Sequence, residues 1–77
     1  MTSYLYIMRN RVREARTQRG LSQAEVAAAL EVSRQTVISI ESGRYSPSLP
    51  LAFRIARLFD STVDKMFDPE DEEAGRC

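Results

Sequence analysis

The segment from Ser22 to Gly43 constrains the fold of this 77-residue chain most strongly, because it holds two helical patterns with almost no room between them. Ser22 and Glu25 form a capping box, in which the serine oxygen accepts a first-turn N–H and the glutamate reaches back to the serine N–H. Apolar residues then recur at helical spacing, at Val26, Ala27 and Leu30. The pattern predicts a helix that begins directly after Ser22.

A second helix is predicted to follow at once. Ser33 is a candidate N-cap. Val37 and Ile40 supply a buried stripe, and Gly43 stands where a left-handed helix end favours glycine. Val32, apolar inside the turn, is expected to plug the core. Two short helices joined by so tight a turn indicate a helix-turn-helix, in which the second helix enters the major groove of DNA.

The side chains off the apolar stripe of the second helix are unusual for a face that only has to keep a protein in solution. They are Arg34, Gln35, Ile38 and Ser39. Arginine can pair with guanine, glutamine can pair with adenine, and an aliphatic group can meet the thymine methyl. The alternative is that these are ordinary exposed helix residues. We interpret the helix over residues 34–42 as the one that reads bases.

The net charge of zero conceals an uneven distribution of charge. Between Arg9 and Arg57, nine arginines stand against four acidic residues, which gives that segment a net charge of +5. Acidic residues gather instead in the sequence DPEDEE at 68–73. A basic body with an acidic tail favours nucleic-acid binding, although small helical proteins also carry uneven charge without it.

Composition argues against several other classes of protein. The chain has no histidine and a single cysteine, Cys77, so we expect no zinc site, no internal disulfide and no histidine-based catalysis. The acidic residues form no paired constellation, and an enzyme is not expected. Neither a membrane span nor a secretory signal is evident, so the expected compartment is the cytoplasm, with association to the nucleoid when DNA is bound.

Three more helices are predicted, over residues 11–19, from 49 or 50 to 59, and over 63–67. Asn10 and Thr62 are the expected caps of the first and last. Residues 1–9 are a strand-like extension, which could pair with the chain after Phe67 or with another subunit. Residues 68–77 are an acidic tail that we expect to be disordered. Residues 10–67 are thus predicted to be a compact all-α domain of five helices, to which the ends can add a pair of strands.

Residues 10–67 resemble the lambda-repressor-like (Cro-like, xenobiotic-response-element) family of bacterial and phage regulators, above all its small stand-alone members. The resemblance is carried without a gap by NRVREAR at 10–16, GLSQ at 20–23, SRQTVISIESGRYSPSL at 33–49 and LAFRIARLFDSTVDKMF at 51–67. Glu31 and Asp60 depart from it, because the family usually has glycine there, and Pro50 replaces an acidic residue. A left-handed Glu31 would carry a strain of about 1–2 kcal/mol, so we expect an altered turn in an intact fold.

The resemblance implies a role for each matching residue. The residues expected to contact bases are Arg34, Gln35, Ile38 and Ser39. The residues expected to contact phosphates are Gln23, Thr36, Arg44, Tyr45 and Ser46. Arg16 and Glu41 are expected to form a structural ion pair between the first and third helices. For the dimer interface we expect Leu58, Met66 and Phe67.

The function that the resemblance implies is sequence-specific regulation of transcription. We expect a repressor that binds a palindromic operator in double-stranded DNA as a homodimer, because two copies can read half-sites about one helical turn apart. No cofactor, small-molecule ligand or membrane is expected. Two alternatives remain open. One is an antitoxin-like module that binds DNA and a protein toxin, and the other is a protein-interaction adaptor, against which Arg34 and Arg44 count.

Overall fold

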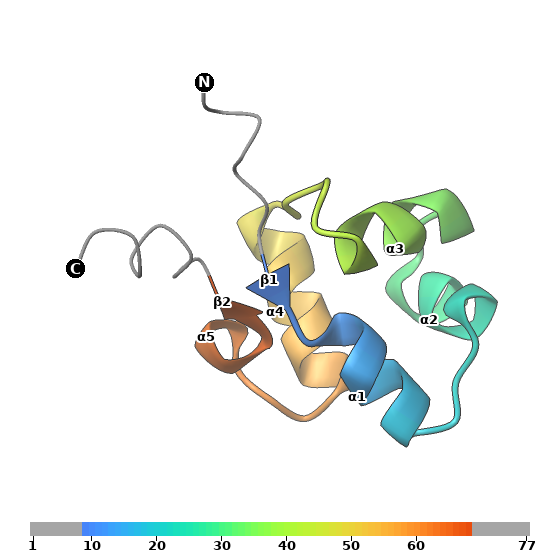
Figure 1. The fold of residues 1–77 in the computed structure, drawn as a ribbon, viewed down its shortest axis with the longest axis horizontal. Helices are drawn as coiled ribbons and strands as arrows, with labels where there is room; N and C mark the ends of the chain where they lie inside the picture. The colour runs from blue at the N-terminus through green and yellow to red at the C-terminus, as the bar shows by residue number, and fades with distance from the viewer. Residues whose placement is uncertain (1–8, 69–77) are drawn as a thin grey trace.

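Five helices make up most of residues 9–68, the part of the chain that the computed structural model describes (Figure 1). In chain order they are α1 (Val12–Gln18), α2 (Gln23–Leu30), α3 (Arg34–Glu41), α4 (Leu49–Leu58) and α5 (Val63–Met66). Where the sequence predicted a helix bound, the observed bound differs by one residue at most. The prediction of an all-α fold with five helices is confirmed.

Two very short strands bring the ends of this helical unit together. β1 (Arg9–Asn10) pairs antiparallel with β2 (Phe67–Asp68), and Arg9 stands opposite Asp68 (Figure 1). Residues 1–8 of the predicted strand-like extension and the tail after residue 68 lie outside the described residues. This pair of strands therefore joins the start of α1 to the end of α5.

Serine side chains set the start of three helices. Ser22 Oγ accepts the N–H of Glu25 at 3.0 Å, and Glu25 Oε1 accepts the N–H of Ser22 at 2.7 Å, so the predicted capping box is confirmed. Ser33 caps α3 by accepting the N–H of Thr36 at 3.1 Å. Ser48 caps α4 in the same way. Each cap satisfies an N–H that the first helical turn leaves without a partner.

The other two helices, α1 and α5, begin without a hydrogen bond from the side chain of the N-cap residue. Arg11 holds the N-cap position of α1, but the side chain of Asn10 accepts the N–H of Val12 at 3.1 Å, so Asn10 still satisfies a first-turn donor. Thr62 holds the N-cap position of α5 without a side-chain capping hydrogen bond. The predicted position of the cap is therefore confirmed, and the first turn is closed by the N–H groups of Lys65 and Met66, which donate to the Thr62 carbonyl oxygen.

Two non-glycine residues adopt left-handed backbone angles where the family pattern has glycine. Glu31, which ends α2, has φ 60°, and Asp60, which follows α4, has φ 52°. Gly43 has φ 83°, as predicted for the residue after α3. The tight turn between α2 and α3 is thus kept at the expense of strain at Glu31, about 1–2 kcal/mol for a residue with a Cβ atom.

A single apolar core lies between the helices. Its residues are Val12, Val26, Ala27, Leu30, Val37, Ile40, Leu51, Ala52, Ile55, Ala56, Phe59, Met66 and Phe67. Val32 packs against it from the turn, as expected. Met66 and Phe67, which were expected at a dimer interface, are only 3% and 6% exposed. Helix α5 is so short that it is held in place by these side chains, which leaves them little surface for a partner.

Candidate nucleic-acid interface

Helix α3 is buried along one side and open along the other. Val37 and Ile40 are 1% exposed and pack in the core with the apolar stripe of α2. The side chains of Arg34 and Gln35, the first two residues of α3, are exposed. Ile38 and Ser39 are half-buried on the next turn. The start of the helix is therefore the part that a large ligand can reach most freely.

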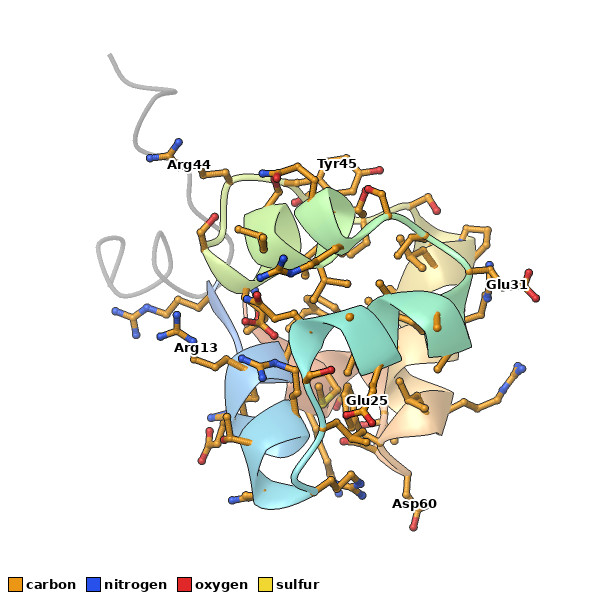
Figure 2. All side chains as sticks on the ribbon, turned by 90° about the vertical axis from the view of Figure 1, so that its right-hand side faces the viewer. Arg13, Glu25, Glu31, Arg44, Tyr45 and Asp60 are labelled. Atoms are coloured by element: carbon orange, nitrogen blue, oxygen red, sulfur yellow. The ribbon has the colours of Figure 1, made fainter. Side chains whose placement is uncertain are left out.

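A shallow concavity connects α3 to the loop that follows it. It has a volume of about 210 Å³ and is lined by Ser33, Gln35, Thr36, Ser39 and Tyr45. Four of these five residues were predicted to contact bases or phosphates. Arg34, Ile38, Arg44 and Ser46 do not line it. Figure 2 shows Arg44 and Tyr45 along the same edge of the molecule as α3.

The loop after α3 is fixed by its own backbone. The N–H groups of Arg44 and Tyr45 both donate to the carbonyl oxygen of Ser39, at 3.1 and 3.2 Å, and the N–H of Gly43 donates to Ile40 at 2.9 Å. These N–H groups are occupied, so an anion at this loop would be bound by side chains. The guanidinium of Arg44 and the half-exposed ring and hydroxyl of Tyr45 are available for that.

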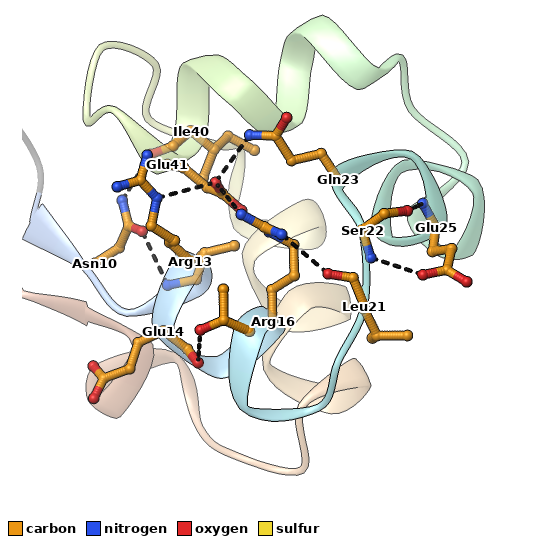
Figure 3. Close-up of polar contacts among 12 residues, drawn as sticks. Asn10, Arg13, Glu14, Arg16, Leu21, Ser22, Gln23, Glu25, Ile40 and Glu41 are labelled. Atoms are coloured by element: carbon orange, nitrogen blue, oxygen red, sulfur yellow. Dashed lines mark hydrogen bonds and ion pairs between the residues drawn. The ribbon is translucent and has the colours of Figure 1, made fainter.

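Arg16 and Glu41 form a nearly buried ion pair that links α1 to α3 (Figure 3). Arg16 Nε lies 2.6 Å from Glu41 Oε2, and Arg16 Nη2 lies 3.2 Å from Oε1. The two side chains are 13% and 2% exposed. Arg16 also donates to the carbonyl oxygen of Leu21 at 3.0 Å. The hydrogen bond to Glu41 raises the pKa of Arg16, so this guanidinium stays charged at neutral pH.

Two further side chains converge on the same carboxylate. Gln23 Nε2 donates to Glu41 Oε1 over 3.2 Å, and Arg13 Nε lies 3.8 Å from that oxygen. Gln23, predicted to contact a phosphate, is thus held at the start of α2 by Glu41. Sequence reasoning missed Arg13, whose side chain is 74% exposed. Its spacing of three residues from Arg16 places both on one face of α1, and that spacing could have revealed it.

Arg54 is a second residue that sequence reasoning missed. Its guanidinium, on α4, donates to the carbonyl oxygen of Leu30, at the end of α2. It also lies 3.7 Å from the carboxylate of Glu31. Arg54 therefore holds the turn that sets α3 against α2. No local pattern reveals this contact, because the two segments are 24 residues apart in the sequence.

The described residues offer no group of three or more His, Cys, Asp or Glu side chains that could hold a metal ion. Within residues 9–68, no helix is long and apolar enough to span a bilayer.

A family model described as helix-turn-helix matches residues 12–66. An uncharacterized HTH-type transcriptional regulator from Methanocaldococcus jannaschii is 46% identical over 66 residues, which cover 86% of this chain and all of that protein. Another from Bacillus subtilis is 42% identical, over 84% of this chain and 98% of that protein. Relatives thus occur in archaea as well as bacteria, which is wider than the bacterial or phage origin expected.

Among solved structures, the restriction-modification controller protein C.AhdI from Aeromonas hydrophila superposes with a TM-score of 0.65 at 33% identity, over 71% of this chain and 83% of that chain. The segment that the family model matches includes α2, α3 and all core residues up to Met66. The resemblance to lambda-repressor-like regulators is confirmed. The chain belongs to the HTH_3 helix-turn-helix family, whose members are DNA-binding transcriptional regulators and not enzymes.

Proposed function

We propose that this protein is a cytoplasmic transcriptional repressor that binds a palindromic operator as a homodimer, with α3 in the major groove. The observation that carries the proposal is the contrast between the two sides of α3. Val37 and Ile40 anchor one side in the core, while Arg34 and Gln35 are exposed at its first turn. The N-terminal residues of a recognition helix are the ones that reach base edges.

Each exposed side chain of α3 suits one kind of base contact. Arg34 can donate two hydrogen bonds to guanine, and the amide of Gln35 can pair with adenine. Ile38 can meet a thymine methyl, and the hydroxyl of Ser39 can serve as donor or acceptor. The partial exposure of Ile38 and Ser39 supports contacts at the edge of the groove and not at the centre of the site.

Phosphate contacts would fix the register of α3 on the duplex. We assign them to the side chains of Thr36, Arg44, Tyr45 and Ser46 along one strand, and to Gln23 at the start of α2. The positive end of the α2 dipole favours a phosphate beside Gln23. Glu41 supports that assignment because it accepts one amide N–H of Gln23. The second amide N–H can then donate to a phosphate of the DNA.

Selection of genomic fragments by the purified protein tests the proposal. The selection is done at about 150 mM salt, where non-specific binding is weak, and the bound fragments are sequenced. We expect an inverted repeat with half-sites about one helical turn apart. Reporter expression from a promoter that carries the repeat should fall when the protein is present. Binding without any enriched sequence, or enrichment with rising expression, would contradict the proposal.

A further inference from the structure

The exposed charges on α3 and on the loop after it are all positive. Arg34 and Arg44 are exposed, and within residues 9–68 neither side chain makes a hydrogen bond or an ion pair. The acidic residue of this segment is Glu41, whose side chain is 2% exposed and paired with Arg16. We call the exposed side chains of residues 34–46 the basic surface. It presents two cations and no exposed carboxylate.

The acidic tail leaves the fold beside the basic surface. Phe67, in β2, pairs with Asn10 in β1, and Asn10 donates its side-chain N–H to the carbonyl oxygen of Ile40 near the end of α3. Neighbouring strands lie only about 4.8 Å apart. Phe67 also lines an apolar groove together with Pro47, three residues after Arg44. The chain therefore continues from β2 close to the end of α3 and to the loop that carries Arg44.

The tail is acidic enough and long enough to cover the basic surface. Residues 70–73 have the sequence EDEE, so four carboxylates follow directly after Pro69. The five residues 69–73 span at most about 17 Å. Helix α3, with eight residues, is about 12 Å long. Arg44 is thus within reach of the first carboxylates, and Arg34, at the far end of α3, is within reach of the last.

We infer that residues 70–73 of the acidic tail dock on the basic surface and compete with DNA for it. The inference rests on the proposed function, which assigns this surface to bases and phosphates. Carboxylate and phosphate oxygens are alternative acceptors for the same guanidinium N–H groups. Because the tail is tethered, its effective concentration at the surface is on the order of millimolar, so a few weak ion pairs are enough to occupy it.

The competition lowers the affinity for every DNA sequence by the same factor. Each duplex must displace the tail before α3 can enter the groove, and the apparent affinity falls with the fraction of protein whose surface is open. Base preference is unchanged, because the tail is absent from every bound state. The tail therefore sets how much protein is needed to fill an operator, and not which operator is filled.

The cavity on the other side of the tail's base is a poorer place for these carboxylates. It has a volume of about 640 Å³ and lies between α1, the end of α4 and α5. Three cations and three carboxylates line it, namely Arg11, Arg19, Lys65, Glu14, Asp60 and Asp64. We call it the neutral cavity. An acidic segment would meet repulsion there as well as attraction, whereas the basic surface offers attraction alone.

A spin label on the full chain tests where the tail docks, in the absence of DNA. Cys77 is the only cysteine, so a nitroxide can be attached there alone. We expect it to broaden the backbone amide signals of residues 34–36 and 44–46 much more than those of residues 17–20, at the far end of α1. The variant Asp71→Asn/Glu72→Gln/Glu73→Gln should lose most of the broadening over α3.

The matched control is Glu14→Gln/Asp60→Asn/Asp64→Asn. It removes the same number of charges from exposed residues of the neutral cavity, so the net charge of the two variants is equal. The control should keep the broadening of the parent. Broadening that is the same in the parent and in the tail variant, or that is strongest around the neutral cavity, would overturn the inference.

Fluorescence anisotropy with a duplex of arbitrary sequence tests the competition. At about 50 mM salt the tail variant should bind at least about threefold more tightly than the parent, and the control should gain less. The difference should vanish near 500 mM salt, where exposed charges are screened within about 4 Å. Equal affinities of the two variants would reduce the effect to net charge and overturn the inference. A tail that docks and competes, in a protein that enriches no genomic sequence, would support the inference and contradict the proposed repressor function.

Discussion

Arg16 and Glu41 hold α1 and α3 together through two hydrogen bonds made by groups that are almost fully removed from solvent. Glu41 is the last residue of α3, whose first residues are the candidates for base contacts. Asn10 adds a second tie by donating from its amide to the carbonyl oxygen of Ile40 at 2.7 Å. The direction in which α3 points therefore depends on polar contacts with α1 as well as on the apolar core.

Replacing Arg16 with leucine should destabilise the fold by about 3 kcal/mol, because the buried side chain of Glu41 would lose its two hydrogen bonds from the guanidinium. Urea unfolding measures this change. The matched control is Arg13→Leu, at 3.8 Å from the same carboxylate and 74% exposed, which should cost less than about 1 kcal/mol. Equal effects of the two substitutions would show that Arg16 acts as a surface charge.

The difference in stability between the parent and Arg16→Leu should not change from about pH 7 to about pH 9. The hydrogen bond to Glu41 raises the pKa of Arg16 above its ordinary value. A group whose pKa is raised by folding contributes its stability below the unfolded pKa and loses it only as the pH rises through the folded one. For arginine both lie far above this range. Urea unfolding at each pH measures this difference in the free energy of unfolding. A difference that becomes smaller as the pH rises would contradict the role given to the Arg16–Glu41 pair.

Replacing Arg34 with alanine should weaken binding to the selected operator by about 1–3 kcal/mol for each half-site and relax the preference at one base pair in each. The physical reason is the loss of two hydrogen bonds to guanine. Fluorescence anisotropy with duplexes that vary at one position measures both effects. The variant Arg34→Lys keeps the charge without the fork of donors and should recover affinity better than base preference. A uniform loss over all sequences would instead place Arg34 on a phosphate.

Replacing Arg44 with alanine should weaken binding to all sequences alike. A homodimer loses one phosphate contact in each half-site, so the slope of log K against log salt should become shallower by about 2. Titrations at several salt concentrations measure that slope. Arg57→Ala is the control, since Arg57 is exposed on α4 and has no proposed contact with DNA. An unchanged slope for Arg44→Ala would remove the loop after α3 from the DNA interface.

Local features of the sequence predicted the helices because each feature acts within a few residues. The capping box at Ser22 and the apolar stripe of α3 both appear in the structure as predicted. Contacts between distant segments could not be predicted in the same way. The burial of Met66 is an example, since a side chain at the end of a four-residue helix has no periodicity that shows which way it faces.

In the candidate site, too, local features could be predicted from the sequence and contacts between distant segments could not. The residues of α3 that face outward follow from the stripe that faces inward, so Arg34 and Gln35 could be identified from spacing alone. The convergence of Arg13 and Gln23 on Glu41 depends on how α1 and α2 pack against α3, and that packing has no local signal. The family resemblance supplied the pairing of Arg16 with Glu41, but not these two additional partners.

Replacing Glu31 with glycine should stabilise the fold by about 0.5–1 kcal/mol. The substitution removes a left-handed strain of about 1–2 kcal/mol and adds back about 0.5–1 kcal/mol of glycine chain entropy. It also removes the ion pair with Arg54, but the Glu31 side chain is 83% exposed, so that pair contributes little. Asp60→Gly is the matched comparison at φ 52° and should gain less, because aspartate tolerates left-handed angles better. Urea unfolding of both variants measures the gains. A loss of stability in Glu31→Gly would mean that the contact with Arg54 outweighs the strain, and that this charged pair holds the turn on which the position of α3 depends.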